Sequence, residues 1–218
     1  NAKPGQFVSI LCSDLILRRP FSIAKAQDDW FEVIYKIKGK GTTIISNFKN
    51  EDEVDLIGPL GKGFNLTSQK ALLLGAGVGS APVIFISQYL KMQKTPYVML
   101  NGFRNKVEIP ELEEESSYIV TEDASTPYKG SVNDYVEKMI VEHNIEKIYT
   151  CGPSVVMKHA VEMARKYDIE IETAMEREFA CGIGVCMGCN IKIYQDNKLI
   201  NKRICKDGPV FNGKDVVW

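Results

Sequence analysis

The stretch Ala71-Leu72-Leu73-Leu74-Gly75-Ala76-Gly77-Val78-Gly79-Ser80-Ala81-Pro82 decides the fold of this sequence. Its apolar start predicts a buried strand, and its glycines predict a tight turn. Apolar residues at helical spacing follow over residues 81–91. A strand, a glycine turn and a helix in this order are typical of a βαβ unit, and such units build a parallel sheet.

The alternation of strands and helices continues on the C-terminal side of this stretch. Further strands are predicted at residues 97–100, 118–121, 145–150 and 169–173, and a helix at residues 132–141. Pro153 stands where another helix begins, because the first helical turn does not need that N–H. About a hundred residues of alternating elements predict a doubly wound parallel sheet. We assign this α/β domain to residues 68–174.

The glycine loop predicts either a ligand site or a packing turn. Gly75, Gly77 and Gly79 lie where the pyrophosphate of a dinucleotide meets a helix N-terminus. Ser80 replaces the third glycine of the G-x-G-x-x-G fingerprint, and no acidic residue follows about twenty positions later. An ordinary NAD-dehydrogenase motif is therefore disfavoured. A phosphate-binding loop and a purely structural turn both remain open.

A second candidate segment, Cys151-Gly152-Pro153, follows the strand predicted at residues 145–150. Ligands of parallel sheets bind in the crevice at the carboxyl ends of the strands, so this segment faces the same crevice as the glycine loop. Taken alone, it indicates only a turn and a helix start.

The first part of the chain, residues 1–67, reads as β structure. Alternating apolar and polar residues predict a strand over residues 31–37, and three lysines alternate on one strand face, namely Lys36, Lys38 and Lys40. Closely spaced glycines and prolines separate the predicted strands, which favours a small antiparallel barrel or sandwich. Another strand begins near Arg18-Arg19-Pro20-Phe21-Ser22. Its arginines are suited to a phosphate or an aromatic ring, or they are solvated charges of an edge strand.

The last part, residues 175–218, carries the most specific motif. Its four cysteines have the spacing C-x₄-C-x₂-C-x₁₅-C and are Cys181, Cys186, Cys189 and Cys205. Plant-type [2Fe–2S] proteins use C-x₄-C-x₂-C with a distant fourth cysteine. Intervening glycines let the backbone wrap closely around a cluster and point N–H groups at its sulfurs. The alternatives are a structural zinc site, which more often has two C-x₂-C knuckles, and unmetallated thiols.

Composition excludes several classes of function. The 27 basic and 28 acidic residues of the 218-residue chain nearly balance, which argues against nucleic-acid binding. No apolar run is long enough to span a bilayer, so no membrane partner is expected. Four of the six cysteines crowd into one segment instead of forming a disulfide framework, which predicts a reduced, cytoplasmic protein.

Together these motifs resemble the ferredoxin–NADP⁺ reductase-like family, and within it the electron-transfer subunits of NAD-dependent dihydroorotate dehydrogenase. Segments resembling its flavin-binding barrel are Pro4-Gly5-Gln6-Phe7, Arg19-Pro20-Phe21-Ser22, Ile34-Tyr35-Lys36, Gly39-Lys40-Gly41-Thr42 and the closing turn Gly58-Pro59-Leu60-Gly61. Residues 75–82 resemble its nicotinamide-dinucleotide loop, and residues 151–153 the C-G-P segment beside the nicotinamide. Residues 181–189 and 205–209 resemble its cluster segment. A strand that precedes Pro4 in the family is expected to be missing from this sequence.

The resemblance implies bound FAD, NAD(H) as substrate and a separate FMN-containing catalytic subunit, with two copies of each chain. It implies FAD contacts by Arg19, Pro20, Phe21, Ser22, Ile34, Tyr35, Lys36, Gly41 and Thr42. Phe21 stands where the family commonly has Leu or Ile, which keeps the flavin packing apolar. Dihydroorotate oxidation itself would occur on the partner.

The chemistry of the three predicted sites is self-consistent. A nicotinamide gives up two electrons together, a [2Fe–2S] cluster accepts one, and a flavin can link the two. No catalytic side-chain acid or base is expected. Two alternatives remain from the sequence: a flavin/iron–sulfur subunit of a sulfhydrogenase, hydrogenase or transhydrogenase, and a zinc-stabilised dinucleotide-binding regulator without a redox role.

Overall fold

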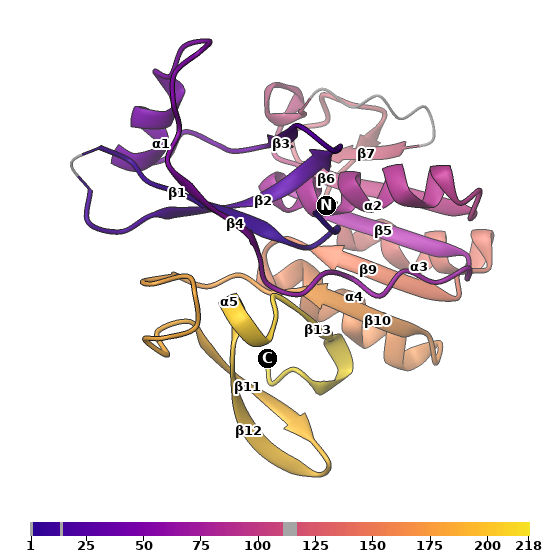
Figure 1. Ribbon diagram of the computed structural model, residues 1–218. Coiled ribbons are helices and arrows are strands. Elements are labelled where there is room, and N and C mark those ends of the chain that lie inside the picture. The colour runs from indigo at the N-terminus through magenta and orange to yellow at the C-terminus, as the bar shows by residue number, and fades with distance from the viewer. Residues whose placement is uncertain (1, 14, 111–116) are drawn as a thin grey trace.

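The computed structural model describes residues 2–13, 15–110 and 117–218 of the chain (Figure 1). A four-stranded antiparallel sheet has the order β3-β2-β1-β4. Its strands are β1 (Phe7–Ile10), β2 (Arg19–Ala26), β3 (Phe31–Val33) and β4 (Leu56–Leu60), with helix α1 (Lys40–Ser46) between the last two. No helix in the described ranges is long and apolar enough to cross a bilayer.

The second sheet has the order β13-β10-β9-β5-β6-β7-β8. Its parallel strands are β5 (Ala71–Ala76), β6 (Tyr97–Phe103), β7 (Ser117–Thr121), β8 (Tyr128–Lys129), β9 (Lys147–Cys151) and β10 (Glu170–Ala174). Helix α2 (Ser80–Met92) packs on one face, and α3 (Asn133–His143) and α4 (Ser154–Lys166) pack on the other. The predicted parallel sheet with helices on both faces is therefore confirmed.

The C-terminal part lies below the antiparallel sheet in the view of Figure 1. It consists of a cysteine-rich loop, the ribbon β11 (Asn190–Gln195) and β12 (Lys198–Arg203), the short helix α5 (Ile204–Asp207) and strand β13 (Val210–Asn212). Strand β13 pairs antiparallel with β10, so the last segment extends the large sheet. From the sequence, no strand was predicted after residues 169–173. Strand β13 was missed because a three-residue edge strand carries no periodic signal, and the ribbon β11–β12 was missed as well.

Two further expectations about the first 67 residues are wrong. The predicted strand 31–37 ends at Val33, and Phe31 and Ile37 are 39% and 59% exposed. The lysines at 36, 38 and 40 therefore share no strand face, and Lys40 instead begins helix α1. The predicted turn 58–61 is mostly strand β4, and the chain turns only at Gly61, where φ is +77°. Pro59 is tolerated there because the pairing of β4 with β1 is irregular.

The linker between the two sheets, residues 61–70, is tied to the parallel sheet by hydrogen bonds. The buried Tyr149 hydroxyl donates to the Asn65 carbonyl at 2.9 Å and accepts from Thr67 N–H at 3.2 Å. Glu172 accepts from Asn65 N–H at 2.9 Å. These bonds hold the antiparallel sheet in a fixed position against the parallel one.

Replacing Tyr149 by Phe is expected to lower the free energy of unfolding by about 1–3 kcal/mol, because two backbone groups of the linker lose their partner. Urea unfolding followed by circular dichroism measures the change. Tyr194→Phe is the matched control. Tyr194 is 55% exposed, so its loss should stay within about 0.5 kcal/mol. Equal stability of the two variants would contradict a holding role for Tyr149.

Candidate functional site

Three of the four motif cysteines lie in the loop before β11, and the fourth, Cys205, lies after β12. Cys189 immediately precedes β11, and Cys205 lies in α5 after β12. The ribbon pairs Asn190 with Arg203, so its two ends meet and bring Cys205 back to Cys189. Cys205 N–H donates to the Cys189 sulfur at 3.4 Å. The fifteen-residue gap in the motif is thus the length of a β-ribbon and its connections.

The cysteines form two pairs. Cys181 and Cys186 make one pair, in which Val185 N–H and Cys186 N–H both donate to the Cys181 sulfur at 3.4 Å. Cys189 and Cys205 form the other pair and are each only 3% exposed. No group of three or more His, Cys, Asp or Glu side chains within the described ranges converges to hold a single metal ion. In a binuclear cluster each iron takes two thiolates, and this arrangement offers two pairs of them.

Cys181 and Cys205 differ in how readily they ionise. Backbone N–H donors from Cys186 and Ile183 lower the pKa of Cys181 to about 6. Burial, followed by the adjacent Cys189 thiol, raises the pKa of Cys205 to about 12. Thiolates are the form that binds iron, so a bound cation would be needed to deprotonate Cys205.

The backbone of the loop makes room for a cluster. Gly182 and Gly184 have φ values of +68° and +85°, which only glycine adopts easily. A Cβ at Gly184 would lie 2.5 Å from the Lys206 side chain. Met187 also has a positive φ, of +60°, in a segment that would hold the metal ligands. Strained residues of this kind are typical of functional loops.

Arg203 supports the loop and was not singled out from the sequence. Its guanidinium donates to the Gly184 carbonyl at 2.7 Å and forms an ion pair with Asp207, Nε to Oδ2 at 3.1 Å. Arg203 and Asp207 flank Cys205. The ion pair holds Arg203 against α5, and the hydrogen bond from Arg203 to Gly184 connects it to the loop that carries Cys181 and Cys186. In the sequence, this ion pair is indicated by the i, i+4 spacing of two opposite charges around Cys205.

Replacing Asp207 by Asn is expected to shorten the lifetime of a bound cluster about tenfold, as is typical when a group that supports a metal ligand is lost. Loss of visible absorbance under air measures the lifetime. Asp215→Asn, in the 3₁₀ turn Gly213–Asp215, is the control and should leave the lifetime unchanged. Equal lifetimes in both variants would contradict a supporting role for Asp207.

The glycine loop and the C-G-P segment meet at the carboxyl ends of neighbouring strands. Gly75 of β5 pairs with Cys151 of β9. A Cβ at Gly79 would lie 2.6 Å from the Cys151 carbonyl oxygen and from Gly152 N. Gly77 has a φ of +55°, and nothing lies within 4 Å of the position of its missing Cβ. The structure therefore brings the two predicted segments into contact and leaves open space above Gly77.

Polar groups without partners collect beneath this edge of the sheet. Ser80 Oγ, both amide atoms of Asn101 and Thr150 Oγ1 are buried and have no hydrogen-bond partner among the described residues. Asn101 pairs in register with Gly75, so it lies directly beside the glycine loop. Cys151 is buried close to the Glu176 carboxylate, Sγ to Oε1 at 3.8 Å. Burial, reinforced by that carboxylate, raises the pKa of the Cys151 thiol far above its usual range.

The segments predicted to contact a flavin gather on and beside β2. The Arg19 side chain packs over Gly41, where a Cβ would lie 2.8 Å from its Cγ and Nε. The rings of Phe21 and Tyr35 meet edge to face, with centroids 5.7 Å apart. The other residues predicted here are Pro20 and Ser22 on β2, the half-buried Ile34, and Thr42 in the first turn of α1.

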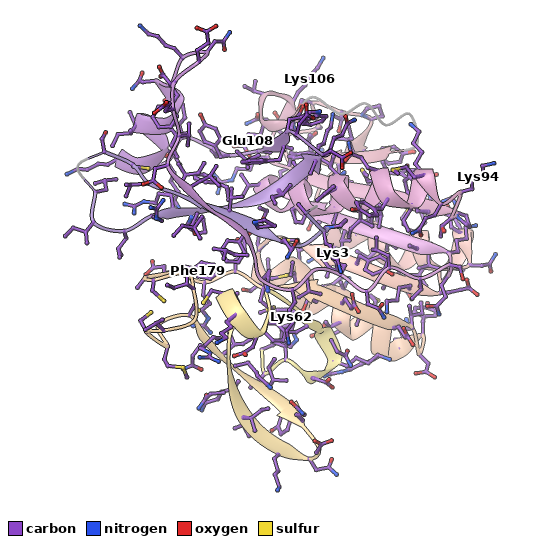
Figure 2. All side chains as sticks on the ribbon, in the orientation of Figure 1. Lys3, Lys62, Lys94, Lys106, Glu108 and Phe179 are labelled. Atoms are coloured by element: carbon purple, nitrogen blue, oxygen red, sulfur yellow. The ribbon has the colours of Figure 1, made fainter. Side chains whose placement is uncertain are left out.

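Lys36 does not join the residues around Arg19. It forms an ion pair with Glu108, in the 3₁₀ turn Lys106–Glu108 that follows β6. Figure 2 labels Glu108 at the boundary between the two sheets. The ion pair lowers the pKa of Glu108 and connects the antiparallel sheet to the parallel one. A cavity of about 610 Å³ lies beside the same segment and is lined by Leu15, Ile37, Lys38, Gly39, Lys40, Thr43 and Ile44.

Comparisons with known proteins agree with this geometry. A family model described as the iron-sulfur cluster binding domain of dihydroorotate dehydrogenase B matches residues 176–217. Among solved structures, the chain resembles an NADH-dependent reduced ferredoxin-NADP oxidoreductase studied for flavin-based electron bifurcation. The TM-score is 0.88 at 28% identity, over 100% of this chain and 80% of that one. The FAD/NAD-binding domain of a Vibrio cholerae nitric oxide dioxygenase shares the fold, with a TM-score of 0.68 at 20% identity over 79% of this chain and 84% of that one.

Curated relatives resemble this chain over nearly all of its length and over most of their own length. The electron transfer subunit of dihydroorotate dehydrogenase B (NAD(+)) from Caldanaerobacter subterraneus subsp. tengcongensis is 37% identical, over 99% of this chain and 87% of the relative. The same subunit from Desulforamulus reducens is 34% identical, over 100% of this chain and 87% of the relative. The chain therefore belongs to the family of electron transfer subunits of NAD(+)-dependent dihydroorotate dehydrogenase B.

Proposed function

We propose that this chain passes electrons between NAD(H), an FAD and a [2Fe–2S] cluster, and from there to an FMN-containing dihydroorotate dehydrogenase catalytic subunit in pyrimidine biosynthesis. The observation that carries the proposal is the pairing of Cys181 with Cys186 and of Cys189 with Cys205, in a chain with this family membership. The four thiolates would hold the two irons, one pair to each iron.

The residues around Arg19 would bind the FAD. Arg19 offers a guanidinium for a phosphate, Gly41 leaves room beneath it, and Phe21 with Tyr35 provides an apolar wall. Ser22, Pro20, Ile34 and Thr42 complete this proposed set, whereas Lys36, paired with Glu108, lies apart from it. Bound FAD takes up two electrons together and releases them singly, which matches a nicotinamide to a one-electron cluster.

The contact between Gly75–Gly79 and Cys151–Pro153 would hold the nicotinamide dinucleotide. The N-terminus of α2, which follows the 3₁₀ turn Gly77–Gly79, carries a partial positive charge that favours a pyrophosphate over the open space at Gly77. The burial of Cys151 keeps its thiol neutral, so it would line the site without adding charge. These residues position the substrate, and no side chain is required to transfer a proton.

We propose that residues 1–67 form the flavin-binding barrel region, residues 68–174 the nucleotide-binding domain and residues 175–218 the cluster segment. The antiparallel sheet β3-β2-β1-β4 would belong to this barrel region. Cys12 and Cys151, which lie outside the cluster motif, form no disulfide in the described part of the chain, which supports a reducing, cytoplasmic environment. An assembly of two copies of each subunit is proposed from the family and would be measured by light scattering of the complex.

The catalytic subunit would dock over Cys186. Cys186 is exposed, and three apolar side chains around it are also exposed: Ile183 at 48%, Val185 at 76% and Met187 at 48%. An apolar rim around an exposed redox ligand suits a protein partner that brings its own redox group close and excludes water.

Replacing Val185 by Asp is expected to weaken electron transfer to the catalytic subunit about thirtyfold, because a charge enters the apolar centre of the interface. NADH-driven reduction of a small dye should be unchanged. Val141→Asp, on the exposed side of α3, is the matched control, since Val141 is 55% exposed and lies on a different element. Loss of both activities in V185D, or equal effects of V185D and V141D, would contradict docking at the cluster loop.

The proposal is tested by adding a purified FMN-containing catalytic subunit, orotate and NADH to the holoprotein. NADH oxidation should require all three components. A second candidate, an FAD/[2Fe–2S] diaphorase subunit of a sulfhydrogenase, hydrogenase or transhydrogenase complex, is favoured by the TM-score of 0.88 to the ferredoxin-NADP oxidoreductase. Rapid NADH oxidation with ferredoxin, and none with the catalytic subunit and orotate, would favour that candidate instead.

A further inference from the structure

Strand β1 is the element that contacts both the proposed flavin segment and the cluster loop. It pairs antiparallel with β2, where Phe7 lies opposite Ser22 and Ser9 lies opposite Pro20. Opposed residues of an antiparallel pair project to the same face of the sheet. Phe7 and Ser9 therefore share a face with Ser22 and Pro20 of the proposed FAD site, while Arg19 and Phe21 of that site project to the opposite face.

The cluster loop packs onto this same face of β1. The ring of Phe179, two residues before Cys181, meets the ring of Phe7 edge to face, with centroids 5.2 Å apart. Figure 2 labels Phe179 on the side of the loop that faces the antiparallel sheet. One residue after Cys181, a Cβ at Gly182 would lie 3.2 Å from Ser9 Oγ.

These two contacts lie on either side of one proposed metal ligand, Cys181, in the sequence. Phe7 touches the chain just before Cys181, and Ser9 touches it just after. Both residues of β1 are buried, Phe7 at 4% and Ser9 at 2% exposure. Cys186 is exposed on the solvent side of the loop. The inner side of the cluster, at Cys181, is thus held against the flavin sheet, while its outer side stays accessible.

We propose that Phe7 and Phe179 are positioning residues that fix the distance between the flavin and the cluster, with Cys181 on the side where electrons enter. The proposal rests on the proposed function above. The step concerned would move one electron from reduced flavin to one ferric ion, so that the iron would become ferrous and the flavin would be oxidised by one electron. An edge-to-face pair has a defined geometry, and this suits it to set a spacing.

The test uses the holoprotein mixed anaerobically with NADH in a stopped-flow instrument. Absorbance follows the flavin, and freeze-quenched EPR follows the reduced cluster. In Phe179→Leu, flavin reduction should keep its wild-type rate, while cluster reduction should slow about tenfold, because misplacement of reacting groups by a fraction of an ångström is costly. Iron and sulfide content and the cluster midpoint potential should be unchanged. Phe179→Tyr, which keeps the ring, should restore the rate.

Phe7→Leu removes the same contact without changing the loop that holds the cluster. If the two rings act as one contact, the double variant should be no slower than the slower single variant. Phe211→Leu is the control, because that ring belongs to the same core cluster but lies against Gly208. It should not change cluster reduction.

Three results would overturn the proposal. They are unchanged cluster reduction in both single variants, additive slowing in the double variant, or loss of the cluster from both single variants, which would make the pair a folding determinant. Failure of the proposed function is distinguishable from these, because the wild-type protein would then show no flavin reduction by NADH or no EPR signal from a cluster.

Discussion

Cys186→Ser is expected to reduce electron flow out of the flavin by at least about a hundredfold, while NADH still reduces the flavin at its normal rate. Loss of a ligand costs more than the loss of a group that only supports one, for which the usual effect is about 10–100-fold. Cys186 lies on the exposed side of the loop, so serine at this position leaves the core of the fold intact. Anaerobic flavin bleaching and EPR of the cluster separate the two steps.

Cys12→Ala is the matched control for this variant. Cys12 is fully buried in the antiparallel sheet region, and its thiol lies 3.6 Å from the Gly41 carbonyl oxygen. It should lower stability slightly and leave the cluster signals unchanged. Wild-type electron flow through the Cys186→Ser protein would show that the C-x₄-C-x₂-C loop does not carry the electrons.

Gly79→Ala is expected to disrupt nicotinamide binding strongly. The new Cβ would lie 2.6 Å from backbone atoms of Cys151 and Gly152, and backbone atoms cannot move aside as a flexible side chain can. The two segments must separate, which should cost about 1–3 kcal/mol of stability and raise the KM for NADH at least about tenfold. Thermal unfolding and steady-state dye reduction measure the two effects.

Gly77→Ala provides the contrast. Nothing lies within 4 Å of its missing Cβ, so the methyl group meets no protein atom, although a φ of +55° costs about 1 kcal/mol for a residue with a side chain. Its main effect should be on NADH affinity, because the methyl group enters the space proposed for the pyrophosphate. If Gly77→Ala bound NADH normally and Gly79→Ala did too, the glycine loop would be only a packing turn.

Much of the fold could be predicted from the sequence because its signals are local. The apolar run at residues 71–74 and the strand–helix alternation after it predict the parallel sheet. Helix α1 was missed because Gly41, Thr42 and Thr43 are weak helix formers. The helix is instead stabilised by tertiary packing, with Ile45 buried against the core of the antiparallel sheet.

The functional sites could likewise be predicted only where their signals are local in the sequence. Cysteine spacing is a property of the sequence, so all four candidate ligands could be named from it. Asn101 and Arg203 were missed because their importance comes from register: Asn101 lies beside Gly75, and Arg203 lies at the end of the ribbon that returns Cys205. The contact of Phe7 with Phe179 joins residues far apart in the chain, and no local pattern indicates it.

The most direct test of the account is an anaerobic titration of the purified holoprotein with NADH, followed by visible absorbance and EPR. The account predicts flavin and iron–sulfur absorbance in one chain, both bleaching as NADH is added, with an EPR signal of a reduced [2Fe–2S] cluster at the end point. A protein that remains colourless after reconstitution with FAD, iron and sulfide, and that binds one zinc ion at its cysteines, would contradict it.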